Sequence, residues 1–222
     1  MQDVYSQSST GIGSVEISKV LRNTYALLAM TMVWSAVCAV IAMAVGMGFM
    51  ASMLCSFGAI GLLWFVLPRT ANSSKGIIVV FAFTGLLGAG LGPLLTHYLA
   101  TANGSAIVAQ ALGGTALIFF GLSGYALVSR KDFSFMTGFL VTGVMVAFVA
   151  SIANIFFQIQ GLALAISCMF LVLSSLMIMW ETSRTIHGGE TNYIMATASL
   201  YVSIYNVFVS LLHILGVMGS DD

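Results

Sequence analysis

The sequence predicts an all-α membrane protein with seven transmembrane helices, and three observations lead to this fold class. Hydrophobic residues make up 59% of the 222 residues and charged residues only 6%, with a mean hydropathy of +1.05. A soluble domain carries about 25% charged residues. The apolar residues fall into seven runs that are long enough to cross a bilayer, and the basic residues lie only between alternate runs. We therefore expect one membrane domain over residues 19–222.

The first span is expected at residues 25–46. Before it, residues 1–18 are polar, rich in Ser and Gly and without helical periodicity, so we expect them to form a flexible tail. The other spans are expected at residues 50–67, 77–100, 105–128, 135–157, 162–180 and 194–217. Pro93 lies inside the third span, where it removes a backbone hydrogen bond and predicts a kink.

Glycines gather in the third, fourth and fifth spans, and in the third and fourth they recur at helical spacing. Those with this spacing are Gly85, Gly88 and Gly92 in the third span and Gly114, Gly121 and Gly124 in the fourth. Small residues let membrane helices approach each other closely. We expect both sets to lie at helix–helix contacts.

The basic residues predict the orientation of the chain. They precede the first span or lie in the loops after the second, fourth and sixth spans: Lys19, Arg22, Arg69, Lys75, Arg130, Lys131 and Arg184. The other loops and the carboxyl terminus carry none. Because basic residues favour the cytoplasmic side, we expect a cytoplasmic amino terminus and a periplasmic carboxyl terminus.

Charge and cysteine content exclude several classes of function. The net charge is zero, so the chain offers no electrostatic basis for binding nucleic acid. The cysteines, Cys38, Cys55 and Cys168, lie inside apolar runs without metal-ligand spacing, which is typical of small buried residues. We expect no disulfide, no metal and no cofactor.

A polar stripe runs along the last span. Its members are Ser199, Ser203, Asn206, Ser210 and His213, spaced by four, three, four and three residues. At about 100° per residue they share one helix face, roughly 80° wide. Hydrocarbon cannot satisfy such a face, so it must meet protein or water. Two interpretations stay open: interhelical hydrogen bonds at the centre of the bundle, or the lining of an ion path.

Glu181 is the acidic residue with the most apolar surroundings. It shares a face of the sixth span with Ser167 and Ser174, each seven residues apart. In one interpretation it pairs with Arg184 and marks the end of the helix. In the other it faces the seventh helix as a proton- or cation-sensitive gate, because burial disfavours the charged carboxylate. Spacing alone leaves both open.

Two motifs look like parts of an enzyme, but the expected geometry argues against both. Gly121-Leu122-Ser123-Gly124 looks like an intramembrane serine protease motif, with His213 as the base. However, Ser123 lies about 10 Å from the basic side of the membrane and His213 about 28 Å, whereas a base must lie within about 3 Å. His187 and Glu190 have a spacing that could bind a metal, but Gly188 and Gly189 predict a loop there. We expect Thr191 or Asn192 to cap the seventh helix after this loop. We therefore expect no catalytic activity.

The chain resembles the Bax inhibitor-1 family over essentially its whole length, and within it the bacterial members. The residues that carry the resemblance lie in several helices and loops at their proper intervals: Lys19 to Tyr25, Phe81 to Gly85, Ala111 to Leu117, Arg130 to Asp132, Ile186 to Ile194 and Ser199 to Ser203. The resemblance implies a fold in which six helices surround a central, carboxyl-terminal seventh.

The resemblance also implies a function. Bacterial members of this type lie in the inner membrane and bind the ATP-dependent membrane protease FtsH. They are slow substrates that restrain its attack on other membrane proteins, and FtsH engages their cytoplasmic amino-terminal tail. The chain is thus expected to modulate FtsH. Other family members are pH-sensitive calcium leak channels, which provides the alternative function.

In those channels, acidic residues on the sixth and seventh helices share a proton, and a basic residue after the second helix exchanges with them. The resemblance places the first acid at Glu181 and the basic residue at Arg69. The second acid falls at Ser203. The chain therefore lacks the like-charge coupling that places a shared proton near neutral pH, which weakens the channel alternative.

Overall fold

The structure, a computed structural model, describes residues 2–219, and of residues 2–15 it describes the backbone alone. All regular elements within residues 2–219 are helices. Seven stretches are long and apolar enough to cross a membrane: Glu16–Ala44, Phe49–Thr70, Lys75–Leu99, Gly104–Ser129, Ser134–Phe157, Gln160–Ile186 and Tyr193–Met218. The predicted class and the number of spans are confirmed.

Several spans combine more than one helix. In chain order the elements are α1 (Gln2–Ala44), α2 (Phe49–Gly61), the π-helix η1 (Leu62–Val66), α3 (Leu67–Thr70), α4 (Lys75–Gly90), α5 (Gly92–Leu99), α6 (Gly104–Ser129), the 3₁₀-helix η2 (Ser134–Met136), α7 (Thr137–Phe157), α8 (Gln160–Ile186) and α9 (Tyr193–Met218). The α4–α5 break places Pro93 in the first turn of α5, so the predicted kink is confirmed.

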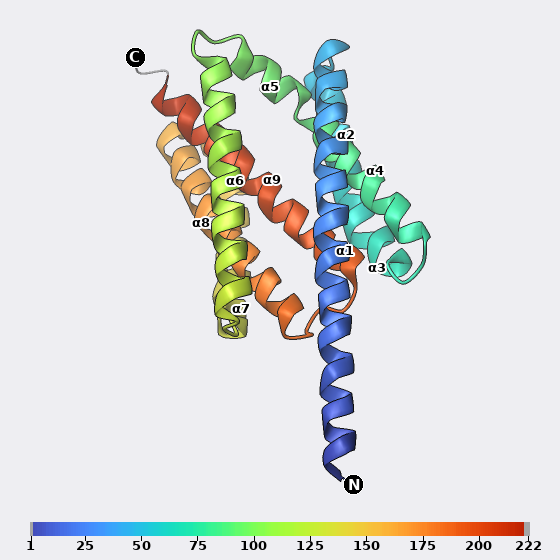
Figure 1. Cartoon of the computed structure of the whole chain (residues 1–222). Coiled ribbons are helices and arrows are strands. Elements are labelled where there is room, and N and C mark those ends of the chain that lie inside the picture. The colour runs from blue at the N-terminus through green and yellow to red at the C-terminus, as the bar shows by residue number, and fades with distance from the viewer. Residues whose placement is uncertain (1, 220–222) are drawn as a thin grey trace.

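Helix α1 begins at Gln2 and is helical through the segment that we expect to be a tail. A stable span lowers the cost of adding further turns, because propagation is easier than nucleation. In Figure 1 this amino-terminal part of α1 extends beyond the rest of the bundle. Its flexibility stays a prediction.

Helix α8 continues to Ile186, six residues beyond the predicted end of the sixth span. Polar residues after Trp180 suggest a loop, but their hydroxyl groups are buried and bonded. Thr182 and Thr185 donate to carbonyls one turn earlier on α8, and Ser183 donates to the carbonyl of Lys131. A helix can therefore carry these residues into its last turns.

The carboxyl-terminal helix α9 packs against α1, α4, α6 and α8, and Figure 1 shows it crossing the bundle obliquely. Helix α2 packs mainly on α4, and α7 mainly on α8. The position of α9 at the centre of all six other spans stays a prediction. All seven basic residues lie at one end of the bundle, where α1 enters and α3, α6 and α8 end. We call this end the basic end.

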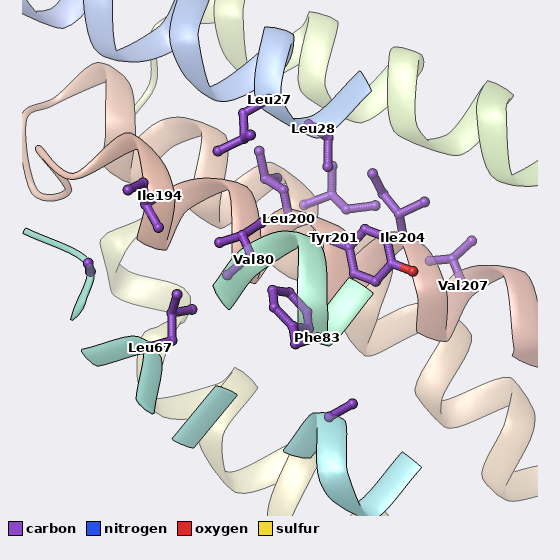
Figure 2. Close-up of a cluster of buried hydrophobic side chains, with 14 residues drawn as sticks. Leu27, Leu28, Leu67, Val80, Phe83, Ile194, Leu200, Tyr201, Ile204 and Val207 are labelled. Carbon is purple, nitrogen blue, oxygen red and sulfur yellow. The ribbon is translucent and has the colours of Figure 1, made fainter. Parts of the chain in front are cut away.

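The largest apolar core joins α1, α4 and α9. Figure 2 shows the Tyr201 ring of α9 among the side chains of this cluster. It meets Phe83 edge-on, with ring centroids 5.6 Å apart. The Tyr201 hydroxyl donates to the carbonyl of Thr84 and is hydrogen-bonded to Ser35. A buried tyrosine thus satisfies its polar end while its ring fills the core.

Two glycines of the third span allow α1 and α4 to pack closely against each other, as predicted. A Cβ on Gly85 would lie 2.6 Å from the Trp34 indole nitrogen, and one on Gly88 would lie 2.2 Å from the Ser35 carbonyl oxygen. The prediction is wrong for the fourth span at Gly121 and Gly124. Apart from the chain neighbours and the backbone of the same helix, no heavy atom of the described residues lies within 4 Å of the Cβ position of either residue.

Candidate functional site

Polar side chains of α8 face those of α9 at both ends of this antiparallel pair. Near the basic end, the Ser199 hydroxyl lies within hydrogen-bonding reach of the Glu181 carboxyl. Near the other end, Ser167 Oγ and His213 Nδ1 lie 2.7 Å apart. The two contacts lie fourteen residues apart on α8 and fourteen residues apart on α9. One alignment of the two helices therefore produces both contacts.

The Ser167 hydroxyl lies between its own helix and α9. It lies 3.1 Å from the carbonyl oxygen of Ala163 and 2.7 Å from His213 Nδ1. The tautomer of His213 sets the direction of the second bond: a protonated Nδ1 donates to Ser167 Oγ, and an unprotonated Nδ1 accepts from it. The predicted stripe thus provides an interhelical hydrogen bond at His213.

The residues in the middle of the stripe are buried or half-buried, and one of them bonds to its own helix rather than to α8. Ser203 and Ser210 are buried, and Asn206 is half-buried. The alignment of the two helices places Asn206 opposite Ser174 of α8. Ser203 donates to the carbonyl of Ser199 on its own helix. The stripe therefore mixes interhelical contacts with hydroxyl groups that bond to their own backbone.

Glu181 is 4% exposed, and its Oε2 has no hydrogen-bond partner among the described residues. Arg184, one turn further along α8, pairs instead with Glu190, at 3.3 Å, and its guanidinium lies 5.3 Å from the centre of the Trp180 ring. The structure therefore does not show the Glu181–Arg184 pair that one of our two interpretations proposes. A buried carboxyl group with a free oxygen is a candidate site for a proton or a cation.

Arg69 does not contact Glu181. Its guanidinium is exposed and donates to the carbonyl of Phe65 on its own span. No ion pair joins it to a described residue. Its role as a basic partner of the sixth-helix acid stays a prediction.

The loop between α8 and α9 is fixed by hydrogen bonds. Asn192 caps α9 by accepting from the backbone of Ile194 and Met195, as one of our alternatives predicts. Its side-chain amide donates to Ala71 and Asn72, which ties the loop to the end of the second span. This helix start is therefore anchored to a neighbouring span as well as capped.

The polar groups of this loop are directed at protein atoms. The His187 ring nitrogens face the carbonyl oxygens of Ser183 and Arg130, at 2.8 and 3.1 Å. Glu190 accepts from the Asn192 backbone as well as from Arg184. Within residues 16–219, no three His, Cys, Asp or Glu side chains form a group that could hold a metal.

Close to this loop, the pKa of one carboxyl group, that of Asp132, is lowered. After α6, the Ser134 backbone N–H donates to Asp132 and holds the pKa of that carboxyl below its usual value. A carboxyl group whose pKa is lowered by folding stabilises the fold at a pH above its unfolded-state pKa. This stabilisation is lost as the pH falls through its folded-state pKa.

Ser123 belongs to a cluster of hydroxyl groups that the sequence did not reveal. Its hydroxyl is hydrogen-bonded to Tyr25 of α1 and lies 3.3 Å from Thr182 Oγ1 of α8. Ser123 is buried, and both of its side-chain partners are hydroxyl groups rather than a base. The cluster links three helices near the basic end. A stabilising role explains this geometry better than nucleophilic catalysis, which needs a general base beside the serine.

The hydrogen bond between α8 and α9 makes a testable contribution to stability. We expect Ser167→Ala and His213→Ala to couple by about 0.6 kcal/mol in a double-mutant cycle, the typical value for such bonds in membranes. The measurement is denaturant unfolding of the purified protein in detergent micelles. Ser175→Ala is the control, because among the described residues Ser175 bonds only to Leu171 of its own helix. Coupling of His213 to Ser175 as strong as to Ser167 would contradict the assignment.

Comparison with known proteins places this arrangement in a family. A family model described as inhibitor of apoptosis-promoting Bax1 matches residues 17–220. The chain belongs to this Bax inhibitor-1 family. The match covers all seven spans, and it confirms the resemblance that the sequence motifs predict.

Several relatives within the Bax inhibitor-1 family are similar over the full length. An Escherichia coli protein named Modulator of FtsH protease YccA is 48% identical over 221 residues, 100% of both chains. A protein from another Escherichia coli strain, named Inner membrane protein YccA, has the same identity and coverage. A membrane protein of Vibrio cholerae is 46% identical over 219 residues, 99% of this chain and 98% of the relative.

Proposed function

We propose that this chain is an inner-membrane protein that binds the FtsH protease and modulates it, without catalytic activity of its own. The observation that carries the proposal is the 48% identity, over the whole of both chains, to a relative named for that role. The seven spans agree with a bilayer location. The hydroxyl cluster at Ser123 and the bonded loop at His187 add no catalytic constellation.

We further propose that the amino terminus is cytoplasmic and serves as the segment that FtsH engages. All seven basic residues lie at the basic end, which favours the cytoplasmic side. Helix α1 enters the bundle there, and its first part projects beyond the other helices (Figure 1). A protease that pulls on its substrate needs such an accessible segment.

The packing of α1 supports slow degradation. The helix packs against α4, α5, α8 and α9, so extraction from the amino terminus must break contacts with both early and late parts of the chain. Trp34 donates to the Phe81 carbonyl of α4, and Tyr25 bonds to Ser123 of α6. A substrate that is engaged easily and extracted slowly occupies the protease and protects other substrates.

Co-purification tests the binding step. The full chain with a carboxyl-terminal affinity tag is isolated in mild detergent from membranes that contain a proteolytically inactive FtsH. We expect FtsH to be recovered with the chain, and not with an unrelated tagged seven-helix protein of equal abundance. Recovery no better than that control would overturn the proposal.

A second candidate function is a proton-regulated calcium leak, and the burial of Glu181 is the observation that favours it. Its carboxyl group lies within hydrogen-bonding reach of Ser199 of α9, and its Oε2 has no hydrogen-bond partner among the described residues. Calcium flux into proteoliposomes is measured across pH 6 to 8, with Glu181→Gln as the control. A leak through this site predicts flux that Glu181→Gln alters. Flux no greater than in empty vesicles removes this candidate.

A further inference from the structure

A deep apolar groove lies between α1 and α6, outside the site described above. Its walls are α1 and α6, its floor is α9, and α5 closes the end away from the basic end. Ala29 and Ala36 line one wall, Ala116 and Phe120 the other, and Tyr205 the floor. Phe120 is 71% exposed at the rim, so the groove opens sideways toward the membrane.

The size of the groove selects its occupant. Its volume is about 660 Å³, within the range of about 300–1,000 Å³ that is typical of small-molecule sites. On α1 it runs from Tyr25 to Met43, which is about 27 Å at 1.5 Å per residue. The residues that line the groove are almost all apolar, so its occupant must be apolar along its length. A lipid acyl chain is long, narrow and apolar, and matches the groove.

Charge selects the class of lipid. The α1 residues of the groove recur every three or four positions, and Arg22 continues that stripe one turn beyond Tyr25 toward the basic end. Arg22 and nearby Lys19 are exposed, and neither forms an ion pair with a side chain of residues 16–219. Their charges therefore lack a partner within the described part of the chain. A phosphate headgroup at the membrane surface would supply one.

The geometry points to a binding site for one anionic phospholipid of the leaflet at the basic end, with an acyl chain in the α1–α6 groove and its phosphate beside Arg22. Tyr25 lies between these two parts and holds α1 to α6 through its hydrogen bond to Ser123. The lipid would thus fill the space where α1 and α6 are held apart. It would add apolar contacts to the helix that we propose FtsH pulls.

Lipid retention tests this site. The wild-type protein is reconstituted in vesicles of equal phosphatidylglycerol and phosphatidylcholine, extracted in mild detergent and measured by native mass spectrometry. We expect one retained phospholipid per chain, with phosphatidylglycerol in excess. Ala116→Trp should abolish retention by filling the groove. Leu117→Trp, whose side chain is 77% exposed and does not line the groove, should retain the lipid.

The headgroup contact has its own variant. Arg22→Gln should lower the preference for phosphatidylglycerol over phosphatidylcholine about fivefold, the contribution of one basic residue near an anionic headgroup. Lys75→Gln, an exposed charge on α4 away from the groove, is the control. Three results would overturn the proposal: no retained lipid in the wild type, equal retention in both Trp variants, or a lipid-free dimer that Ala116→Trp disrupts.

Discussion

Replacing Gly88 with alanine should destabilise the bundle by about 3 kcal/mol, the upper range for overpacking a close contact. The added Cβ would lie 2.2 Å from the Ser35 carbonyl oxygen and 2.6 Å from Ser35 Oγ. The nearest atom belongs to the backbone, so α1 and α4 must separate to make room. Tyr201, which is hydrogen-bonded to Ser35, would lose its alignment in the core. The measurement is thermal unfolding in detergent micelles.

Gly113→Ala is the matched control. Gly113 also lies within a membrane helix. Apart from the chain neighbours and the backbone of α6, no heavy atom of the described residues lies within 4 Å of its Cβ position. Alanine there should leave the unfolding temperature unchanged or raise it, because alanine favours the helix. Equal effects of the two substitutions would show that close approach of α1 and α4 is not what Gly88 provides.

Deletion of residues 1–18 should lengthen the half-life of the chain severalfold in cells that contain active FtsH. Without this segment α1 begins at its membrane span, and the protease has nothing to engage beyond the bundle. The measurement is the decay of the protein after protein synthesis is stopped. In cells without FtsH, wild type and deletion should decay equally.

A replacement control separates length from sequence. A Gly/Ser stretch of the same length in place of residues 1–18 is unstructured, and it should restore degradation if an accessible segment is all that FtsH requires. Unchanged turnover of the deletion variant would refute the role of this segment. It would leave the binding measured by co-purification as a separate question.

The seven spans were predictable because hydropathy and the placement of the basic residues report the same topology. The kink at Pro93 and the cap at Asn192 were predictable because each follows from local backbone chemistry. The last turns of α8 were not, since Thr182, Ser183 and Thr185 suggest a loop until their buried hydrogen bonds are seen. Local polarity therefore misplaced this helix end.

The site was only partly accessible from the sequence, because side-chain pairing depends on how helices rotate against one another. The spacing of polar residues on α8 and α9 placed them on one face of each helix and left open what those faces meet. It did not show that Arg184 selects Glu190, or that Tyr25 reaches Ser123. The groove between α1 and α6 was inaccessible for the same reason, since four helices build it. Its alanines look like ordinary membrane residues in the sequence.

A competition assay measures modulation itself. FtsH and a membrane-anchored reporter substrate are reconstituted in proteoliposomes with ATP, and reporter loss is followed with and without an equal amount of this chain. We expect the wild-type chain to slow the loss of the reporter, and the chain lacking residues 1–18 to slow it less. A reporter that disappears at the same rate with or without the wild-type chain would contradict its role as a modulator of FtsH.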